Sequence, residues 1–309
     1  MTQPARPARA SRRVRVNRSI DASQSCPLDS NASKTLNAFD ASHASNARYL
    51  PSDPLRVDAG VFEWHASRPR TVEIHYDLEF DALAARLGAH GARRADDVFV
   101  HVVNASASAG GVLGPQGAGP NFDGGLISLC ACNHGMRASL DACDWPGRWV
   151  AGFTTYSGMF GHQQYLRYLM RVGEAYASQH ELVSALVHSG RADVVDAKDA
   201  SRHASGDVWR IKPGSASDAA TGRWRATTYC RPVIGHAHRE DVDDETWHKD
   251  IEYVDQHGRR AALLVGDPRW SFVWNQPFIC KTDPGPLRGH RRVSVTALLK
   301  HLRASAVAT

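Results

Sequence analysis

Three strand-like segments between Gly119 and Val172 place the strongest constraint on the fold. They are Leu126–Cys132 (LISLCAC), Arg148–Phe153 (RWVAGF) and Tyr165–Val172 (YLRYLMRV), and each is bounded by glycine, proline or a cluster of charges. In the third segment apolar residues at positions 166, 168, 170 and 172 alternate with positions 167, 169 and 171, which is the period of a β-strand. These segments predict that the middle of the chain forms a sheet.

Further strands and a few helices are predicted on either side. Strands are predicted at Thr71–Phe80, Asp97–Val103, Ala261–Val265 and Ser271–Trp274, and helices at Asp81–Gly88, at 178–190 behind a Ser178/Glu181 capping box, and at the C-terminus, where Val295, Leu298, Leu299 and Leu302 share a helical face. The glycine-rich stretch Asn104–Gly119 reads as a long loop. Many short strands with few helices favour an α+β fold built around a small, barrel-like sheet.

The net charge of +5 is confined to the first 50 residues. That stretch carries eight Lys and Arg against three Asp and Glu, and it almost lacks bulky apolar residues, so burial cannot offset its ordering entropy. We therefore predict a disordered basic tail at 1–50, an extension packed on the core at 51–97, and the main domain at 98–309. The tail arginines suit either a solubilising extension or non-specific contact with nucleic acid.

Cysteine use and hydropathy indicate the compartment. The chain has six cysteines but no apolar leader, and no apolar run approaches the roughly 20 residues of a membrane span. These features predict a cytoplasmic protein with reduced thiols and no membrane partner. Cys130, Cys132 and His134 alternate and could hold zinc with Cys143, but structural zinc usually uses tight Cys-x₂-Cys turns, so small buried cysteines are the preferred interpretation. With no phosphate loop or dinucleotide fingerprint, we expect neither metal nor cofactor.

Aromatic and acidic residues supply the candidate site. A base-binding pocket needs stacking faces and a few polar groups, and the candidates for it are Pro120, Asn121, Trp149, Tyr168 and Trp209. Asn121, Asp207 and Asp250 are the candidate catalytic residues, because a carboxylate beside a base can activate water or bind a base amine. Buried core aromatics and turn-capping aspartates are the simpler alternatives.

Basic residues are candidates for contact with phosphate. They are Arg137, Arg171, Arg288, His290, Arg291 and Arg292. The last four belong to RGHRR, which precedes the C-terminal helix. Solvated surface arginines are an equally good interpretation of the same run.

The order of these segments resembles the second family of nucleotide-modification-associated domains, found in phage and bacterial loci that make or counter modified DNA bases. The matching segments run from VFVHVVN through PNFDGG, LISLCACNHGMR, WVAGF, YLRYLMRVGEAY, GDVWR and HAHREDVDDETWHKD to ALLVG, WSFVW and GHRR. The resemblance implies a PUA-like barrel, related to ASCH and EVE domains, that accepts modified bases or nucleosides. The family-like positions are Pro120, Asn121, Cys132, Arg137, Arg171, Asp207, Asp250, Gly289 and His290.

Three functions are compatible with these features. The first is a DNA protein of a phage-defence or DNA-modification system that flips a modified base into an aromatic pocket and processes it, in the manner of a DNA glycosylase. The second is a non-catalytic reader of modified bases. The third is an enzyme on free modified nucleosides or nucleotides. The sequence does not decide between them.

Overall fold

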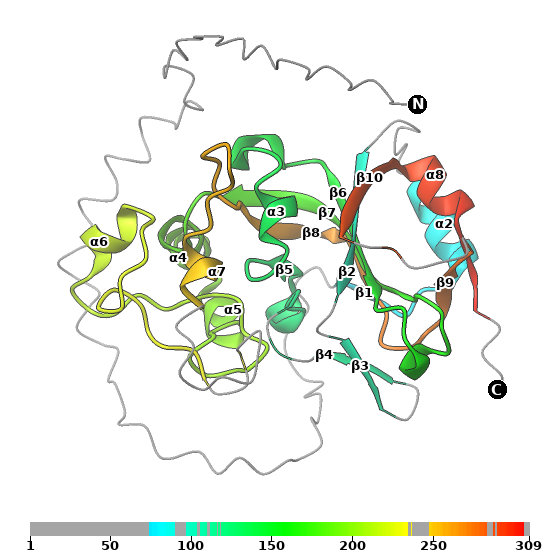
Figure 1. The fold of residues 1–309 in the computed structure, drawn as a ribbon, viewed down its shortest axis with the longest axis horizontal. Coiled ribbons are helices and arrows are strands. Elements are labelled where there is room, and N and C mark those ends of the chain that lie inside the picture. The colour runs from blue at the N-terminus through cyan, green and yellow to red at the C-terminus, as the bar shows by residue number, and fades with distance from the viewer. Residues whose placement is uncertain are drawn as a thin grey trace, which may run out of the picture. The chain divides into compact units, whose positions relative to one another are not determined.

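A mixed seven-stranded sheet forms the centre of the computed structural model (Figure 1). The strands are β1 (His75–Tyr76), β2 (Asp97–Val103), β5 (Ser128–Leu129), β6 (Trp149–Thr154), β7 (Leu166–Tyr176), β8 (Leu263–Val273) and β10 (His290–Ser294). They follow the order β1-β8-β7-β6-β2-β10, with β5 also paired to β8. The β1–β8 and β2–β6 pairs are parallel and the other pairs are antiparallel. The fold is thus α+β, and the sheet does not close into a barrel over the described residues.

The structure describes residues 74–89, 97–103, 106–109, 112–115, 117, 119–233, 236, 247–282, 287 and 289–305. The predicted tail at 1–50, the predicted extension before residue 74, and Arg288 lie outside these ranges. The described residues all fall in one compact unit, Ser67–Thr309. Within them, no helix combines the length and apolarity needed to cross a bilayer.

Side-chain alternation along the strands gives the sheet two apolar faces. On β2, Val98 and Val100 pack on one face, against α2 (Phe80–Ala89) and α8 (Val295–Lys300), while Phe99 and Val103 pack on the other. That second face is covered by β5 and by α3 (His134–Arg137). Figure 1 shows α2 and α8 on one side of the sheet and α3 on the other. Strands buried on both faces read as nearly continuous apolar runs, as VFVHVV does.

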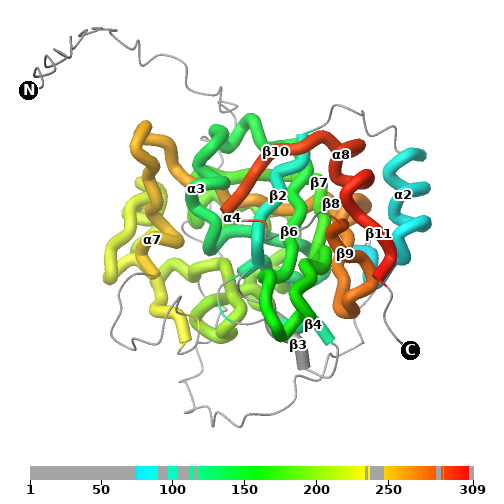
Figure 2. The backbone as a smooth tube through the Cα atoms, turned by 45° about the vertical axis from the view of Figure 1, so that its right-hand side comes forward, coloured from blue at the N-terminus to red at the C-terminus, as the bar shows by residue number. Residues whose placement is uncertain are grey.

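The remaining helices gather beyond β5 and the end of β7 (Figure 1), and Figure 2 shows the same yellow segment on the side of the molecule away from α2 and α8. They are α4 (Gln179–His188), α5 (Ala192–Ala197), α6 (Ala216–Ala220) and α7 (His248–Ile251), with short 3₁₀ turns at Asp123–Gly125, Ala142–Asp144 and Gly158–Phe160. The N-cap of the predicted capping box is confirmed, since Ser178 Oγ accepts from Glu181 N at 3.2 Å; the Glu181 side chain reaches back one residue further, with Oε2 accepting from Ala177 N at 2.9 Å. Two pairs stand apart from the central sheet, β3 (Ser106–Ala109) with β4 (Val112–Pro115), and β9 (Ile279–Lys281) with β11 (Leu302–Ala304).

Several predicted elements were wrong in their extent. Of the predicted strand at Thr71–Phe80, only β1 (His75–Tyr76) is a strand among the described residues, and Phe80 begins α2. The two late strands are one, β8, because residues between Gly266 and Ser271 have no partner on β7 and the missing N–H of Pro268 therefore breaks no ladder bond. The 126–132 strand shrinks to β5, since the chain turns at Cys132 and Asn133, whose φ values are 21° and 50°. The 104–119 loop contains the β3–β4 hairpin. The last helix ends at Lys300, and Leu302 begins β11.

Gly152 on β6 generates a stability prediction. A Cβ at this position would lie 2.2 Å from Tyr168 Cε1 and 2.6 Å from Val103 Cγ2, and both neighbours are buried. Gly152→Ala is therefore expected to lower the free energy of unfolding by about 1–3 kcal/mol, the usual cost of overpacking a core. Urea denaturation measures the change.

Gly88→Ala is the matched control for that substitution. Gly88 lies in α2, and a Cβ added there would have no neighbouring atom within 4 Å, so alanine meets open space. The control is expected to raise stability by about 0.5–1 kcal/mol, because alanine favours the helix. A Gly152→Ala protein as stable as the wild type would contradict the tight packing described for β6.

Candidate functional site

Asn121 organises a buried polar cluster next to β5. Its backbone pairs with Ser128 through two 2.9 Å hydrogen bonds, which fixes the PNFDGG loop beside the strand. Its side chain donates from Nδ2 to Ser205 O at 2.8 Å and accepts at Oδ1 from Asp123 N at 2.8 Å and from Lys198 Nζ at 2.9 Å. Asn121 is 1% exposed, so these protein groups satisfy the amide without solvent.

Lys198 is the residue of this cluster that the sequence analysis missed. Its ammonium donates to Asn121 O, Asn121 Oδ1 and Leu126 O at 2.9–3.0 Å, which uses all three of its protons. Burial lowers the pKa of Lys198, and the charge of Asp207 opposes that shift. Nothing local marks this lysine in the sequence, because it becomes special only when the end of α5 packs on the loop at 121–126.

Asp207 accepts hydrogen bonds at both carboxylate oxygens. Ser128 Oγ donates to Oδ1 at 2.9 Å and Cys130 N donates to Oδ2 at 3.1 Å. Asp207 is fully buried; burial raises its pKa, while Lys198 lowers it. The preceding Gly206 allows this close approach, since a Cβ there would lie 2.5 Å from Ala200 N. Asp207 therefore positions β5 and its loop rather than facing an open cavity.

Arg137 lies buried beside this cluster, and its contacts are backbone carbonyls. Nε donates to Cys132 O at 2.9 Å and Nη1 to Ala262 O at 2.7 Å, while Nη2 has no hydrogen-bond partner among the described residues. Burial lowers its pKa, and Asp250 and Asp207 are among the groups that raise it. Its guanidinium is 0% exposed, so the predicted contact with DNA phosphate is not available to Arg137 in this structure.

His134 and Asp250 form the most accessible part of the site. The turn at Cys132 and Asn133 starts α3, and the i, i+3 spacing puts His134 and Arg137 on one side of that helix. His134 Nε2 lies 2.7 Å from Asp250 Oδ1, with the imidazole side chain 17% exposed and the carboxylate 0% exposed. The imidazole also stacks on Tyr253 at a centroid distance of 5.0 Å.

A second histidine approaches Asp250 from the opposite side. His236 Nε2 lies 3.8 Å from Asp250 Oδ2, and its Nδ1 lies 3.1 Å from Ala204 O. His236 is fully buried and packs edge-on against Trp209. The two carboxylate oxygens of Asp250 thus face two imidazoles, one partly exposed and one buried.

The predicted aromatic pocket is not assembled as one site. Trp149 packs on the α2/α8 face of the sheet, Tyr168 packs on the opposite face, and Trp209 lies in a separate cluster with Tyr229 and Trp247. All three predicted aromatics are at most 1% exposed. Pro120 is buried beside Asn121. The structure places these three rings in three different parts of the core.

Tyr168 instead pairs with His101 inside the second face. Tyr168 Oη lies 2.5 Å from His101 Nε2, and both residues are fully buried. Burial lowers the pKa of His101 to about 4 and raises that of Tyr168. His101 is therefore neutral at pH 7, and its Nε2 accepts a hydrogen bond from the tyrosine hydroxyl.

The predicted phosphate-binding residues divide between two faces. His290, Arg291 and Arg292 are exposed on the edge strand β10. The Arg292 guanidinium lies 5.1 Å from the Phe99 ring centroid and forms an ion pair with Asp97. Arg291 points the other way. Arg171 is half-buried on β7, opposite Trp149. Gly289, with φ of 64°, makes the turn that begins β10.

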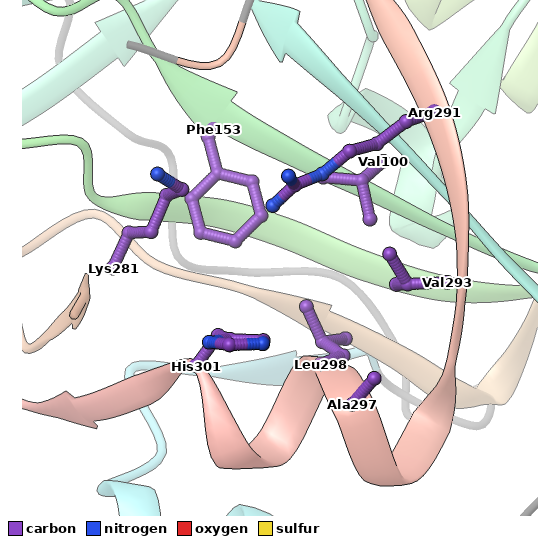
Figure 3. Close-up of a pocket in the computed structure, with 8 residues that line it drawn as sticks. All are labelled: Val100, Phe153, Lys281, Arg291, Val293, Ala297, Leu298 and His301. Carbon is purple, nitrogen blue, oxygen red and sulfur yellow. The ribbon is translucent and has the colours of Figure 1, made fainter. Parts of the chain in front are cut away.

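Arg291 lines a small hollow between β10 and α8 (Figure 3). Lys281 and His301 point into the same hollow, whose apolar wall includes Phe153 and Leu298. Its cavity volume of about 20 Å³ is room for a single water rather than a nucleobase. The hollow can therefore receive at most the edge of a bound group.

Cys130 is buried in the core and Cys132 is partly buried at its edge, and the two do not share one face of a strand. Cys143 is disulfide-bonded, so the prediction of reduced thiols is wrong for this cysteine. Cys130 donates weakly to Leu264 O at 3.9 Å, and Cys132 accepts from Asn133 Nδ2 at 3.4 Å. Burial raises the pKa of both thiols, that of Cys132 to about 12, so both are protonated at neutral pH. Within the described ranges no group of three or more His, Cys, Asp or Glu side chains has a metal-binding arrangement.

Comparison with known proteins adds no assignment. No family model, no curated protein and no solved structure matches this chain. The function must therefore be argued from the site itself.

His101 generates a prediction for the pH dependence of stability. Its pKa is about 4 in the folded protein against 6.5 when unperturbed, so the unfolded chain binds the proton first as pH falls. Stability is expected to be complete above about pH 6.5 and to fall by about 3 kcal/mol as the pH drops through 4. Denaturant midpoints measured between pH 7.5 and 4 test this.

His101→Gln should remove this pH-dependent contribution to the free energy of unfolding. The glutamine can still accept from Tyr168 but does not titrate, so the variant is expected to lose less stability than the wild type on acidification. His203→Gln, at an exposed position, controls for the loss of one histidine. Parallel pH profiles for the wild type and His101→Gln would contradict the buried neutral imidazole.

Proposed function

We propose that this protein acts on a modified nucleobase in DNA, with His134 and Asp250 as the reacting pair. The observation that carries the proposal is the 2.7 Å contact between the buried Asp250 carboxylate and the partly exposed His134 imidazole. A buried carboxylate stabilises the imidazolium that forms when His134 takes a proton, and such pairs are characteristic of general base catalysis. The finer fold, a PUA-like barrel that receives the base, belongs to the same proposal.

Family-like residues around this pair support the proposal. Residues 121, 132, 137, 207 and 250 come from distant parts of the chain, and the charge of Arg137 couples to Cys132, Asp207 and Asp250. Lys198 and Asp207 fix the loop and strand that flank α3. The cluster is therefore a rigid support of the kind that a catalytic pair needs.

The reaction we propose is hydrolysis of the N-glycosidic bond. His134 takes a proton from a water molecule, the water oxygen bonds to C1′ of the deoxyribose, and the C1′–N bond breaks. The base leaves with its bonding electron pair and acquires a proton, so the products are an abasic site and a free base. Unstacking the base costs a few kcal/mol, which favours bulky or damaged bases that stack poorly.

Asp250→Asn tests the assigned pair. The wild type is incubated with phage DNA that carries modified cytosines, and mass spectrometry measures the bases released. We expect the variant to release base at least ~100-fold more slowly, the usual contribution of a general base, with DNA affinity changed less than about twofold. Asp193→Asn, an exposed carboxylate on α5, is the matched control and should retain the wild-type rate. An Asp250→Asn protein as fast as the wild type would contradict the assignment.

A non-catalytic reader is the second candidate. The observation that favours it is the saturation of Asn121 and Asp207 by protein groups, which suits a binding scaffold. A reader binds modified DNA more tightly than plain DNA and releases no base. Asn121→Ala tests it, because loss of the side chain that fixes the loop at 121–126 is expected to remove that preference, whereas Asp193→Asn, the exposed control, keeps it.

The salt dependence of binding at the exposed edge strand β10 distinguishes DNA from free nucleotides as the substrate. Binding to a duplex through Arg291 and Arg292 makes affinity fall with salt, because phosphate contacts release counterions. Replacing both residues with alanine is expected to reduce the slope of log affinity against log salt by about 2. Fluorescence anisotropy at several salt concentrations measures this slope. Affinity that does not depend on salt would favour a free nucleoside and count against DNA.

A further inference from the structure

Arg167 is a buried cation whose position the proposed reaction does not explain. It lies near the start of β7 and is 0% exposed. Nη1 donates to the backbone oxygen of Trp274 and to Asn275 Oδ1, the latter at 3.2 Å. The guanidinium carbon lies 4.6 Å from the centroid of the Phe122 ring. These contacts hold one end and one face of the guanidinium.

The other edge of the same guanidinium is unsatisfied. Nε and Nη2 have no hydrogen-bond partner among the described residues, and no carboxylate there lies within ion-pair distance of Arg167. Among the acids, Asp77 has the largest charge effect on the pKa of Arg167. Its Oδ1, however, accepts hydrogen bonds from Asn275 N at 2.6 Å and Gln276 N at 3.0 Å rather than from Arg167. Burial lowers the pKa of Arg167 only to about 10, so it is charged at pH 7.

A buried charge without a counterion is costly and is seldom kept without a use. Nε–H and one Nη2–H point the same way, which is the edge by which arginine grips a carboxylate or a phosphate with two parallel hydrogen bonds. We propose that Arg167 is an anion-binding residue whose Nε/Nη2 edge receives a small oxyanion, either a phosphate group or a carboxylate group.

The surroundings restrict what this site accepts. Phe122 stacks beneath the guanidinium and contacts Tyr168, with ring centroids 5.8 Å apart, so the walls are apolar or neutral. The β3–β4 hairpin is attached next to this site: Leu113 is buried, and its N donates at 2.7 Å to the backbone oxygen of Asn275, whose side chain accepts from Arg167. A small terminal anion fits these limits, and a nucleic-acid duplex does not.

Thermal unfolding with added anions tests the site, independently of the proposed reaction. The full-length protein is measured in Tris chloride at constant ionic strength with sodium phosphate, sodium acetate, deoxycytidine monophosphate or deoxycytidine. At least one oxyanion is expected to raise the melting temperature of the wild type, because it binds only the folded state. Arg167→Lys keeps the charge but loses the two-pronged edge, and it should weaken the apparent affinity at least ~10-fold. Arg303→Met, an exposed arginine on β11, should leave affinity unchanged.

The anions that stabilise the protein show whether the natural ligand of Arg167 carries a phosphate or a carboxylate group. Tighter binding of the monophosphate than of inorganic phosphate, with none of deoxycytidine, indicates a nucleotide phosphate. Acetate alone indicates a carboxylate. In Tris chloride without added oxyanion, Arg167→Met should unfold no earlier than the wild type, since replacing a buried charge by an apolar side chain is often neutral or stabilising. The absence of a shift with every anion, equal shifts in the wild type and Arg167→Lys, or failure of Arg167→Met to fold would overturn the proposal.

Discussion

Burial of charge next to β5 determines how the rest of the protein fits together. Lys198 joins the end of α5 to the loop at 121–126, and Asp207 joins the following segment to Ser128 and Cys130. These contacts link parts of the chain about 70–80 residues apart, so they hold the helices after β7 against the sheet. Apolar packing alone is non-directional. The three hydrogen bonds of the buried Lys198 ammonium, by contrast, can all form only when the end of α5 and the loop at 121–126 are correctly placed, and any other placement leaves a buried charge unsatisfied. Breaking the hydrogen bonds of Lys198 or Asp207 would leave an uncompensated buried charge. The helices after β7 are therefore expected to pack on the sheet cooperatively.

Local periodicity was sufficient to predict some of the regular elements. The strands β2, β6 and β7 and the helix α4 follow from alternation and from a capping box, which act over a few residues. The bulge in β8 and the early turn at Cys132 could not be predicted from the sequence, because both depend on which strand packs alongside. The same limit applies to aromatic residues. Alternation shows that Trp149 and Tyr168 face inward, but not that they face opposite sides of one sheet.

The candidate site was predicted in part, and for a physical reason. Asn121, Asp207 and Asp250 could be predicted because they lie next to glycines or aromatics, where a polar side chain in an otherwise apolar segment suggests a functional site. Lys198 and His236 lie in polar segments, where nothing distinguishes them from solvated residues. Their roles come from packing partners far away in the sequence. His134 was considered only as a metal ligand, since the pattern Cys130, Cys132, His134 assumes a straight strand. The turn into α3 separates it from that pattern and directs it to Asp250.

The two buried arginines show why satisfaction of hydrogen bonds matters more than burial when function is inferred. Arg137 is surrounded by the carbonyls of Cys132, Ala261 and Ala262, and Trp145 Nε1 also binds the Arg137 carbonyl, so this residue ties α3 to β8 and the 3₁₀ turn before β6. Its Nη2 has no hydrogen-bond partner among the described residues, but the charges of Asp250 and Asp207 raise the pKa of this guanidinium. Arg167 is as deeply buried, but its Nε/Nη2 edge has no hydrogen-bond partner and no acid within ion-pair distance among the described residues. A structural role accounts for the contacts of Arg137. It leaves those of Arg167 incomplete, and an external anion would complete them.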